Sequence, residues 1–292
     1  MLLSLTIAKA GPLLVINCIF GITEVNMHEL LTHTRAVEKQ SYTYDFSICT
    51  LVNHMPEYEQ MVASFIQAGF SPISCEFLYV DNTQSNTYDA YSGLNTMLQQ
   101  ARGKYVVLCH QDILLEFHHR KELETRIEEL DTLDPTWAIA GNAGAAGPNH
   151  IVYKVSYPDG TLANKGKLPL KVQSLDEHFI MVKNGLGIGL SGDLEGFHLY
   201  GADICLQAEV KGYASYVIDF HLLHKSKGNP DQSFQQCEKN LVRKYSRFFR
   251  PRWVQTTTTL FHLPSNPNHG SGRKGPSLFL IRMWNGLKKK LG

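Results

Sequence analysis

Three short apolar runs, separated by segments with helical spacing, constrain the fold of this chain more than any other feature. The runs are FSICTLV at 46–52, EFLYV at 76–80 and YVVLC at 105–109, and they are rich in β-branched and aromatic residues. Between them, apolar residues recur every three or four positions, and Gly69 and Gly103 follow where helices are expected to end. This alternation predicts βαβ units and therefore an α/β domain.

Polar residues follow each of the three predicted strands. Right-handed crossovers bring the carboxyl ends of parallel strands to one edge of a sheet, and ligands bind in the crevice at that edge. The third run ends at a carboxylate, which makes Asp112 the first candidate for chemistry. The residues expected to line this crevice are Asn53, His54, Asp81, Asn82 and Asp112.

Composition excludes some partners and indicates a compartment. Lys and Arg number 28 against 27 Asp and Glu, so the formal net charge of +1 gives no global attraction for nucleic acid or membranes. Nucleic acid is therefore not a predicted partner, and any attraction must be local. The six cysteines form no CxxC pair and lie mostly in apolar segments, which predicts free thiols and a cytoplasmic location.

The chain divides into three predicted regions. The first twenty residues are apolar, but Lys9 interrupts them before they reach the length of a membrane span. We therefore expect an appendage at 1–40, the main domain at 41–262, and a linker with a basic tail at 263–292.

The basic tail has two interpretations. Leu280, Trp284, Leu287 and Leu291 share one helical face, and the other residues of the tail include several lysines and arginines but no acid. This pattern predicts either an amphipathic helix on an anionic membrane or a terminal helix packed on the main domain. In the first case the protein is peripheral on the inner face of the membrane.

Two polar residues stand out in the second half of the chain. Asp203 begins a short predicted helix that ends at Gly212, and His224 ends the apolar run VIDFHLL. The simplest interpretations are a helix N-cap for Asp203 and a backbone hydrogen bond for His224. Alternatively, both side chains take part in the chemistry that Asp112 indicates.

The order of these segments resembles one enzyme family. HQD at 110–112, FHLYGAD at 197–203 and a later strand ending at His224 resemble the family 2-like glycosyltransferases of the GT-A fold, in the subgroup with HQD in place of the usual DxD. Further similar segments are VDNTQSN at 80–86, GLNTMLQQARGKYVV at 93–107 and VQSLDEHFIMVKNGLG at 172–187. The resemblance implies a Rossmann-like nucleotide-sugar-binding domain with a mixed, mainly parallel central sheet.

The resemblance also implies a reaction, a metal-dependent and inverting transfer of a hexose-like sugar from a nucleotide-sugar donor to a hydroxyl of a glycan or lipid-linked acceptor. Charge that builds on the leaving diphosphate is neutralised by Mn²⁺ or Mg²⁺, held by Asp112 and His224. Asp203 is the implied general base, although Ala202 stands where the family carries an acid. The implied nucleotide contacts are Asn53, Asp81, Asn82, Asn95, His110 and Gln111, and the implied acceptor contacts are Asp176, Glu177, His198 and Tyr200.

Other interpretations stay open at this point. Asp81 is equally suited to capping the turn at Asn82 and Thr83. A metal-dependent hydrolase is an alternative function, using His110, Asp112, His221 and His224. A non-catalytic nucleotide-binding module is a second alternative, which would need Asp81 but not Asp203.

Overall fold

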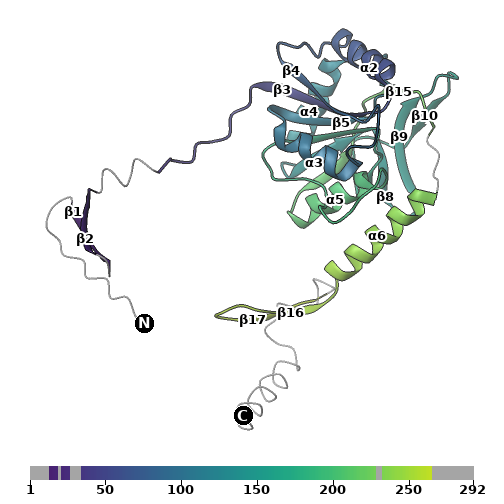
Figure 1. The fold of residues 1–292 in the computed structure, drawn as a ribbon. Coiled ribbons are helices and arrows are strands. Elements are labelled where there is room, and N and C mark those ends of the chain that lie inside the picture. The colour runs from purple at the N-terminus through teal and green to yellow at the C-terminus, as the bar shows by residue number, and fades with distance from the viewer. Residues whose placement is uncertain (1–12, 19–20, 27–33, 228–231, 265–292) are drawn as a thin grey trace. The chain divides into compact units, whose positions relative to one another are not determined.

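The computed structural model describes residues 13–18, 21–26, 34–227 and 232–264 (Figure 1). The chain divides into two units, Met1–Ser41 and Tyr42–Gly292. In the first unit, β1 (Leu13–Cys18) pairs antiparallel with β2 (Gly21–Asn26). From residue 265 onward the predicted basic tail lies outside the described residues, so both of its interpretations stay predictions.

The second unit is built on a seven-stranded sheet with the order β11-β14-β7-β13-β5-β3-β4. Within the described part of the chain, β13 and β11 run opposite to the other five strands. The strands are β3 (Tyr44–Val52), β4 (Cys75–Asp81), β5 (Gly103–Cys109), β7 (Trp137–Gly141), β11 (Leu170–Val172), β13 (Phe179–Lys183) and β14 (Ala214–Val217). The predicted α/β class with a mixed, mainly parallel sheet is confirmed.

Helices cover both faces of this sheet because the strand side chains alternate between two apolar cores. In β3, Phe46 and Ile48 pack in one core, whereas Cys49 packs in the other. The first core contains α2 (Met55–Gln67) and α4 (Arg120–Leu133), and the second contains α3 (Ala90–Gln100) and α5 (Tyr200–Val210). Leu123, Ile127 and Leu130 are the buried residues of α4.

A second, smaller sheet lies next to the carboxyl ends of the central strands. Its strands are β6 (Ile113–Leu114), β8 (Ala143–Gly147), β9 (His150–Ser156), β10 (Leu162–Lys165), β12 (Ser174–Leu175) and β15 (Leu222–His224). The alanine- and glycine-rich segment at 143–147 forms β8. This segment is a strand because it pairs with both β9 and β12. Gly144 permits that pairing, since a Cβ there would lie 2.4 Å from the Ser174 carbonyl oxygen.

The register of the central strands brings polar residues together at one edge. Val52 of β3 lies opposite Asp81 of β4, and Cys49 lies opposite Leu108 of β5. The residues that follow these strands therefore leave the sheet side by side, as the predicted crossovers require. The side chains of Cys49, Cys75, Cys109 and Cys205 are buried and free, which confirms that part of the thiol prediction.

The remaining described elements follow β15 in the chain. α6 (Gln232–Phe248) is followed by a hairpin of β16 (Arg252–Gln255) and β17 (Leu260–Leu263). Among the described residues, no helix combines the length and the apolar character that a membrane crossing requires.

Candidate active site

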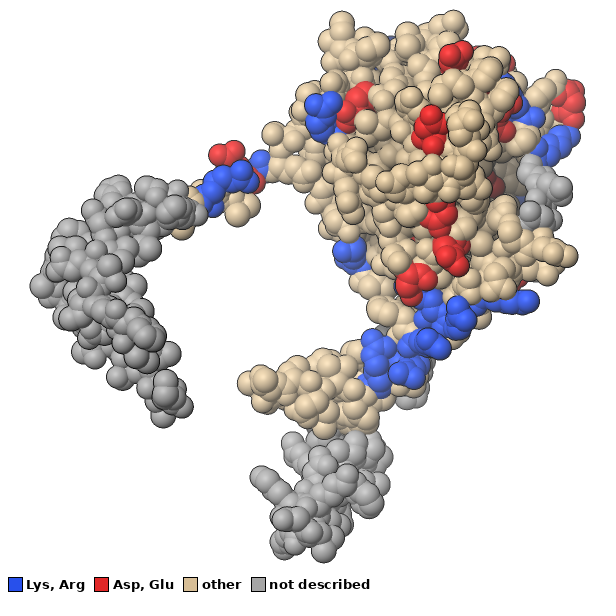
Figure 2. Space-filling view, in the orientation of Figure 1, with Lys and Arg blue, Asp and Glu red and all other residues tan. Residues whose placement is uncertain are grey.

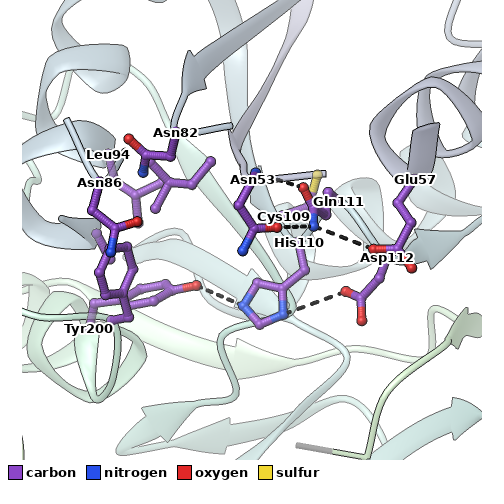
Figure 3. A pocket seen from close by; sticks show the side chains of 13 residues that line it. Asn53, Glu57, Asn82, Asn86, Leu94, Cys109, His110, Gln111, Asp112 and Tyr200 are labelled. Atoms are coloured by element: carbon purple, nitrogen blue, oxygen red, sulfur yellow. Dashed lines mark hydrogen bonds and ion pairs between the residues drawn. The ribbon is translucent and has the colours of Figure 1, made fainter. Parts of the chain in front are cut away.

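A pocket of about 280 Å³ opens at the carboxyl ends of β3, β4 and β5 (Figure 3). One wall comes from the segments that follow these strands, and the other comes from α3 and the start of α5. Its described lining residues are Leu51, Asn53, Glu57, Asn82, Asn86, Ala90, Leu94, Cys109, His110, Gln111, Asp112, Phe197 and Tyr200. The sequence had not indicated Glu57, Asn86 or Phe197, because they come from a helix and two connecting segments rather than from strand ends.

Three potential metal ligands meet at one end of this pocket. One donor atom from each of His110, Asp112 and His224 lies within 4.8 Å of the others. Asp112 Oδ1 is 3.3 Å from His224 Nε2 and 3.9 Å from His110 Nδ1. The pairing of β6 with β15 produces this convergence, because it sets His224 opposite Ile113, next to Asp112. The sequence predicted the meeting of Asp112 and His224, whereas His110 had been assigned to the nucleotide.

The charge states of these groups suit a cation. Burial alone would raise the pKa of Asp112, but its hydrogen bond to His224 and the electrostatic influence of that imidazole hold it well below its ordinary range. Burial, with the nearby His224 and His178, lowers the pKa of His110 to about 4. At neutral pH the cluster therefore offers an ionised carboxylate and at least one neutral imidazole, a donor set that fits a divalent ion.

A fourth histidine, His178, lies beside this cluster. It is 3% exposed, and its ring stacks on the His224 ring with 4.8 Å between centroids. His178 Nδ1 is hydrogen-bonded to Asp176, while its Nε2 is buried without a hydrogen-bond partner among the described residues. No sequence pattern indicated this residue, because its position depends on β13 inserting antiparallel beside β5.

Gln111 joins two of the loops that form the pocket. Its Oε1 accepts the backbone N–H groups of Asn53 and His54, each at 3.0 Å. Its Nε2 donates to Asn53 Oδ1 at 2.5 Å and to Glu57 Oε2 at 3.3 Å. The amide of Gln111, predicted to contact the nucleotide, is therefore mainly occupied in holding the segment after β3 against the segment after β5.

Two of the predicted nucleotide contacts lie away from the pocket. Asp81 is exposed, and its Oδ1 accepts both the N–H of Thr83 at 2.9 Å and the Thr83 hydroxyl at 2.7 Å, which is the alternative turn-capping role. Asn95 bonds the backbone of Leu190 through both ends of its amide. In contrast, Asn82 lines the pocket while its side chain holds the backbone of Tyr88.

Asp203 does not reach the pocket. It is 0% exposed and is not among the residues that line the pocket. It sits one turn inside α5 and is not the N-cap of this helix, because that position is occupied by Leu199. Its carboxylate accepts the N–H and the hydroxyl of Ser191 at 2.7 and 2.6 Å and the hydroxyl of Tyr245 at 2.7 Å. These three bonds fix the carboxylate within the protein, whereas a general base has to reach the proton that it accepts.

The predicted acceptor contacts separate into different environments. Asp176 is 56% exposed and adjoins the metal-ligand cluster through His178. Tyr200 lies in the pocket, where its hydroxyl is 3.0 Å from His110 Nε2 and donates to the Glu177 carbonyl at 3.1 Å. His198 lies outside the lining, with its ring against Phe234.

Glu177 caps α5 from a distant part of the chain. Its carboxyl group accepts hydrogen bonds from the backbone N–H groups of Leu199, Tyr200 and Gly201, which begin the helix. Burial, followed by the charge of Asp176, nevertheless raises the pKa of Glu177 to about 8. We therefore interpret Glu177 as a support for Tyr200 rather than as an acceptor contact.

Glu177→Gln is expected to reduce the pH dependence of stability. The pKa of Glu177 is raised, so its contribution is present at low pH and is lost as pH rises toward 8. Raising the pH from about 5 to about 8 should lower the free energy of unfolding of the parent protein by roughly 3 kcal/mol, and that of the glutamine variant by less, as measured by thermal unfolding at both pH values. Equal losses in both proteins would mean that Glu177 is already ionised in the folded state at pH 5.

Comparison with known proteins gives one clear relative. The "ATP synthase subunits region ORF 6" protein of Fuscovulum blasticum is 36% identical over 231 residues, which span 77% of this chain and 93% of that protein. No family model matches the chain.

Solved structures give weaker similarities. A mannosyltransferase of Pyrobaculum calidifontis, PcManGT, solved with GDP-Man and Mn²⁺, has a TM-score of 0.44 at 15% identity, over 76% of this chain and 68% of that one. TarS of S. aureus has a TM-score of 0.44 at 12% identity, over 70% of this chain and 43% of that one. At this level of similarity, a function has to be argued from the site itself.

Proposed function

The chain belongs to the family of the Fuscovulum blasticum "ATP synthase subunits region ORF 6" protein, and we propose that it is a metal-dependent glycosyltransferase that uses a nucleotide-sugar donor. The observation that carries this proposal is the cluster of His110, Asp112 and His224 at one end of a pocket whose described lining has no basic side chain of Lys or Arg. None of the described residues that line the pocket is Lys or Arg, while Glu57 and Asp112 are acidic.

Charge balance explains why a cluster of metal-ligand side chains in a pocket without Lys or Arg among its described lining residues favours a ligand that contains a diphosphate group. Two carboxylates would repel a diphosphate unless a divalent cation lay between them. Asp112 and His224 would hold Mn²⁺ or Mg²⁺, with His110 as a third ligand, and the bound ion would neutralise charge on the departing diphosphate. Mixed imidazole and carboxylate ligands favour Mn²⁺ of the two.

The rest of the pocket has the chemistry of a nucleoside site. Asn53, Asn82 and Asn86 supply amides, and Phe197 and Leu94 supply apolar surface. Gln111 keeps Asn53 in place, so the wall is organised before a ligand arrives. We propose that the base and ribose occupy this end and that the diphosphate points toward Asp112.

The acceptor is proposed to approach on the Asp176 side. Asp176 is the exposed carboxylate beside the cluster, and the charges of Asp176 and His110 influence each other's pKa. An inverting reaction needs a base on the face opposite the leaving group, and Asp203 is too enclosed for that role. We therefore propose Asp176, oriented by His178, as the group that contacts the acceptor hydroxyl.

Release of nucleoside diphosphate from a panel of nucleotide sugars tests this function. With Mn²⁺ present, one donor should give release that rises when a glycan or lipid-linked acceptor is added. Mn²⁺-dependent cleavage that is indifferent to every acceptor would favour the hydrolase instead. Tight donor binding without any turnover would favour the nucleotide-binding module.

The four-residue hydrolase site considered from the sequence is not assembled. His221 lies apart from the other three, with its Nε2 2.8 Å from the Ser156 hydroxyl and its ring stacked on Phe117. Participation in the assembly of polysaccharide or glycolipid at the cytoplasmic face of a membrane is the wider role that we propose for this enzyme.

A further inference from the structure

The end of α6 carries a basic surface that the proposed active site does not use. Figure 2 shows Lys and Arg side chains gathered along this helix. We define the α6 basic surface by its cations, Arg243, Lys244, Arg247, Arg250 and Arg252. Together with Asp193, Leu194, Asn240 and Phe248 they border an open depression of about 540 Å³. The overall net charge of +1 makes this a local concentration of charge.

Most of this charge is not neutralised by carboxylates. Lys244 pairs with Asp193, but Arg247 and Arg250 have no ion pair within the described part of the chain. Arg243 donates to the Asn240 side chain at 2.9 Å, and both partners remain accessible at the rim of the depression. Unpaired guanidinium groups on one surface attract phosphate groups.

Apolar side chains are exposed at the end of α6, and one of them, Phe248, lines the depression and has the Arg252 guanidinium over its ring. Phe248 is 45% exposed, Phe249 is 50% exposed, and Val242 is also exposed. Aromatic and aliphatic groups beside arginines form the amphipathic pattern that binds an interface between water and lipid. Neither a duplex nor a folded RNA has an apolar layer that would cover a valine and two phenylalanines.

The surface is held firmly against the main body of the domain. Tyr245, on the inner side of α6, hydrogen-bonds the buried carboxylate of Asp203. Nearer the start of the same helix, Cys237 Sγ lies 3.6 Å from the Glu195 carbonyl oxygen. A second copy of this chain that docked through the same surface would bring arginines against arginines, which argues against self-association there.

We propose that the α6 basic surface docks this protein on a membrane with anionic headgroups. The arginines would contact lipid phosphates while Phe248 and Phe249 enter the headgroup layer. This contact is distinct from the predicted tail of residues 263–292, and it holds whatever reaction the pocket catalyses.

Flotation of the full chain with vesicles tests the proposal. We expect recovery with phosphatidylcholine vesicles that contain phosphatidylglycerol, little recovery with phosphatidylcholine alone, and loss of binding at high salt. Substituting Arg243, Arg247 and Arg250 together by Gln should weaken binding by roughly fivefold for each charge removed. Phe248→Ser should weaken binding while leaving its salt dependence unchanged.

Two matched variants, each with the same change in net charge, complete the design. Lys121, Lys165 and Lys211 are exposed elsewhere on the domain, and their triple substitution by Gln should leave binding unchanged. Substituting Lys288, Lys289 and Lys290 by Gln removes charge from the tail instead. The proposal is overturned if only the tail variant loses vesicle binding, or if the triple arginine variant of α6 binds vesicles as well as the triple lysine variant of the domain does. It is also overturned if the chain binds RNA but no vesicle.

Discussion

Asp112→Asn is expected to remove metal-dependent turnover, lowering kcat by roughly a thousandfold. The amide keeps the shape of the carboxylate but loses the negative charge that His110 and His224 surround. It would also leave a diphosphate without its bridging cation in a pocket that has no Lys or Arg among its described lining. The measurements are Mn²⁺ affinity by calorimetry and nucleoside diphosphate release at saturating donor.

Asp81→Asn is the matched control for this change. Asp81 also follows a central strand, but it is exposed and caps Thr83 outside the pocket. Its substitution should change activity by no more than about twofold. If both variants lose activity equally, the donor site extends to Asp81 as the sequence first indicated. If Asp112→Asn binds Mn²⁺ like the parent protein, the metal cluster is misassigned.

Asp203→Asn is expected to cost stability rather than catalysis, on the order of 3 kcal/mol. The carboxylate accepts three hydrogen bonds, and all three partners are donors. An asparagine amide would turn its own N–H₂ toward a donor and leave at least one buried group unsatisfied. Thermal unfolding should show a decrease of roughly 10 °C, while activity per folded molecule stays near that of the parent protein.

The partners of Asp203 provide the controls. Ser191→Ala and Tyr245→Phe each remove donors but keep the carboxylate, so each should cost less, about 1 kcal/mol for every bond lost. A large loss of kcat in Asp203→Asn without a change in melting temperature would restore this residue as the general base.

The βαβ half of the fold was predictable because its information is local. The runs at 46–52, 76–80 and 105–109 became β3, β4 and β5, and the helical spacing between them became α2 and α3. The segment at 143–147 was not predictable, because small residues such as Ala143 and Gly144 form a strand only when β9 and β12 lie beside them. Pairing partners, rather than propensity, determine that strand.

The candidate site divides in the same way. Asn53, Asn82 and Asp112 could be placed from the ends of parallel strands, and all three line the pocket. The burial of Asp203 could not be predicted, because a sequence match fixes a position along the chain but not the direction in which the side chain points. The sequence also did not predict that Gln111 holds two loops of the pocket together, since its partner Asn53 follows a different strand.

The pairing of β6 with β15 has a consequence for the order in which this molecule assembles. It joins Asp112 to His224 across about half of the length of the domain, and the intervening segment must already be folded back for the two to meet. Closing so long a loop is entropically costly and comes late on a folding pathway. Nascent or partly folded chains would therefore lack the complete set of proposed metal ligands, so that uptake of metal would report completion of the fold between Asp112 and His224.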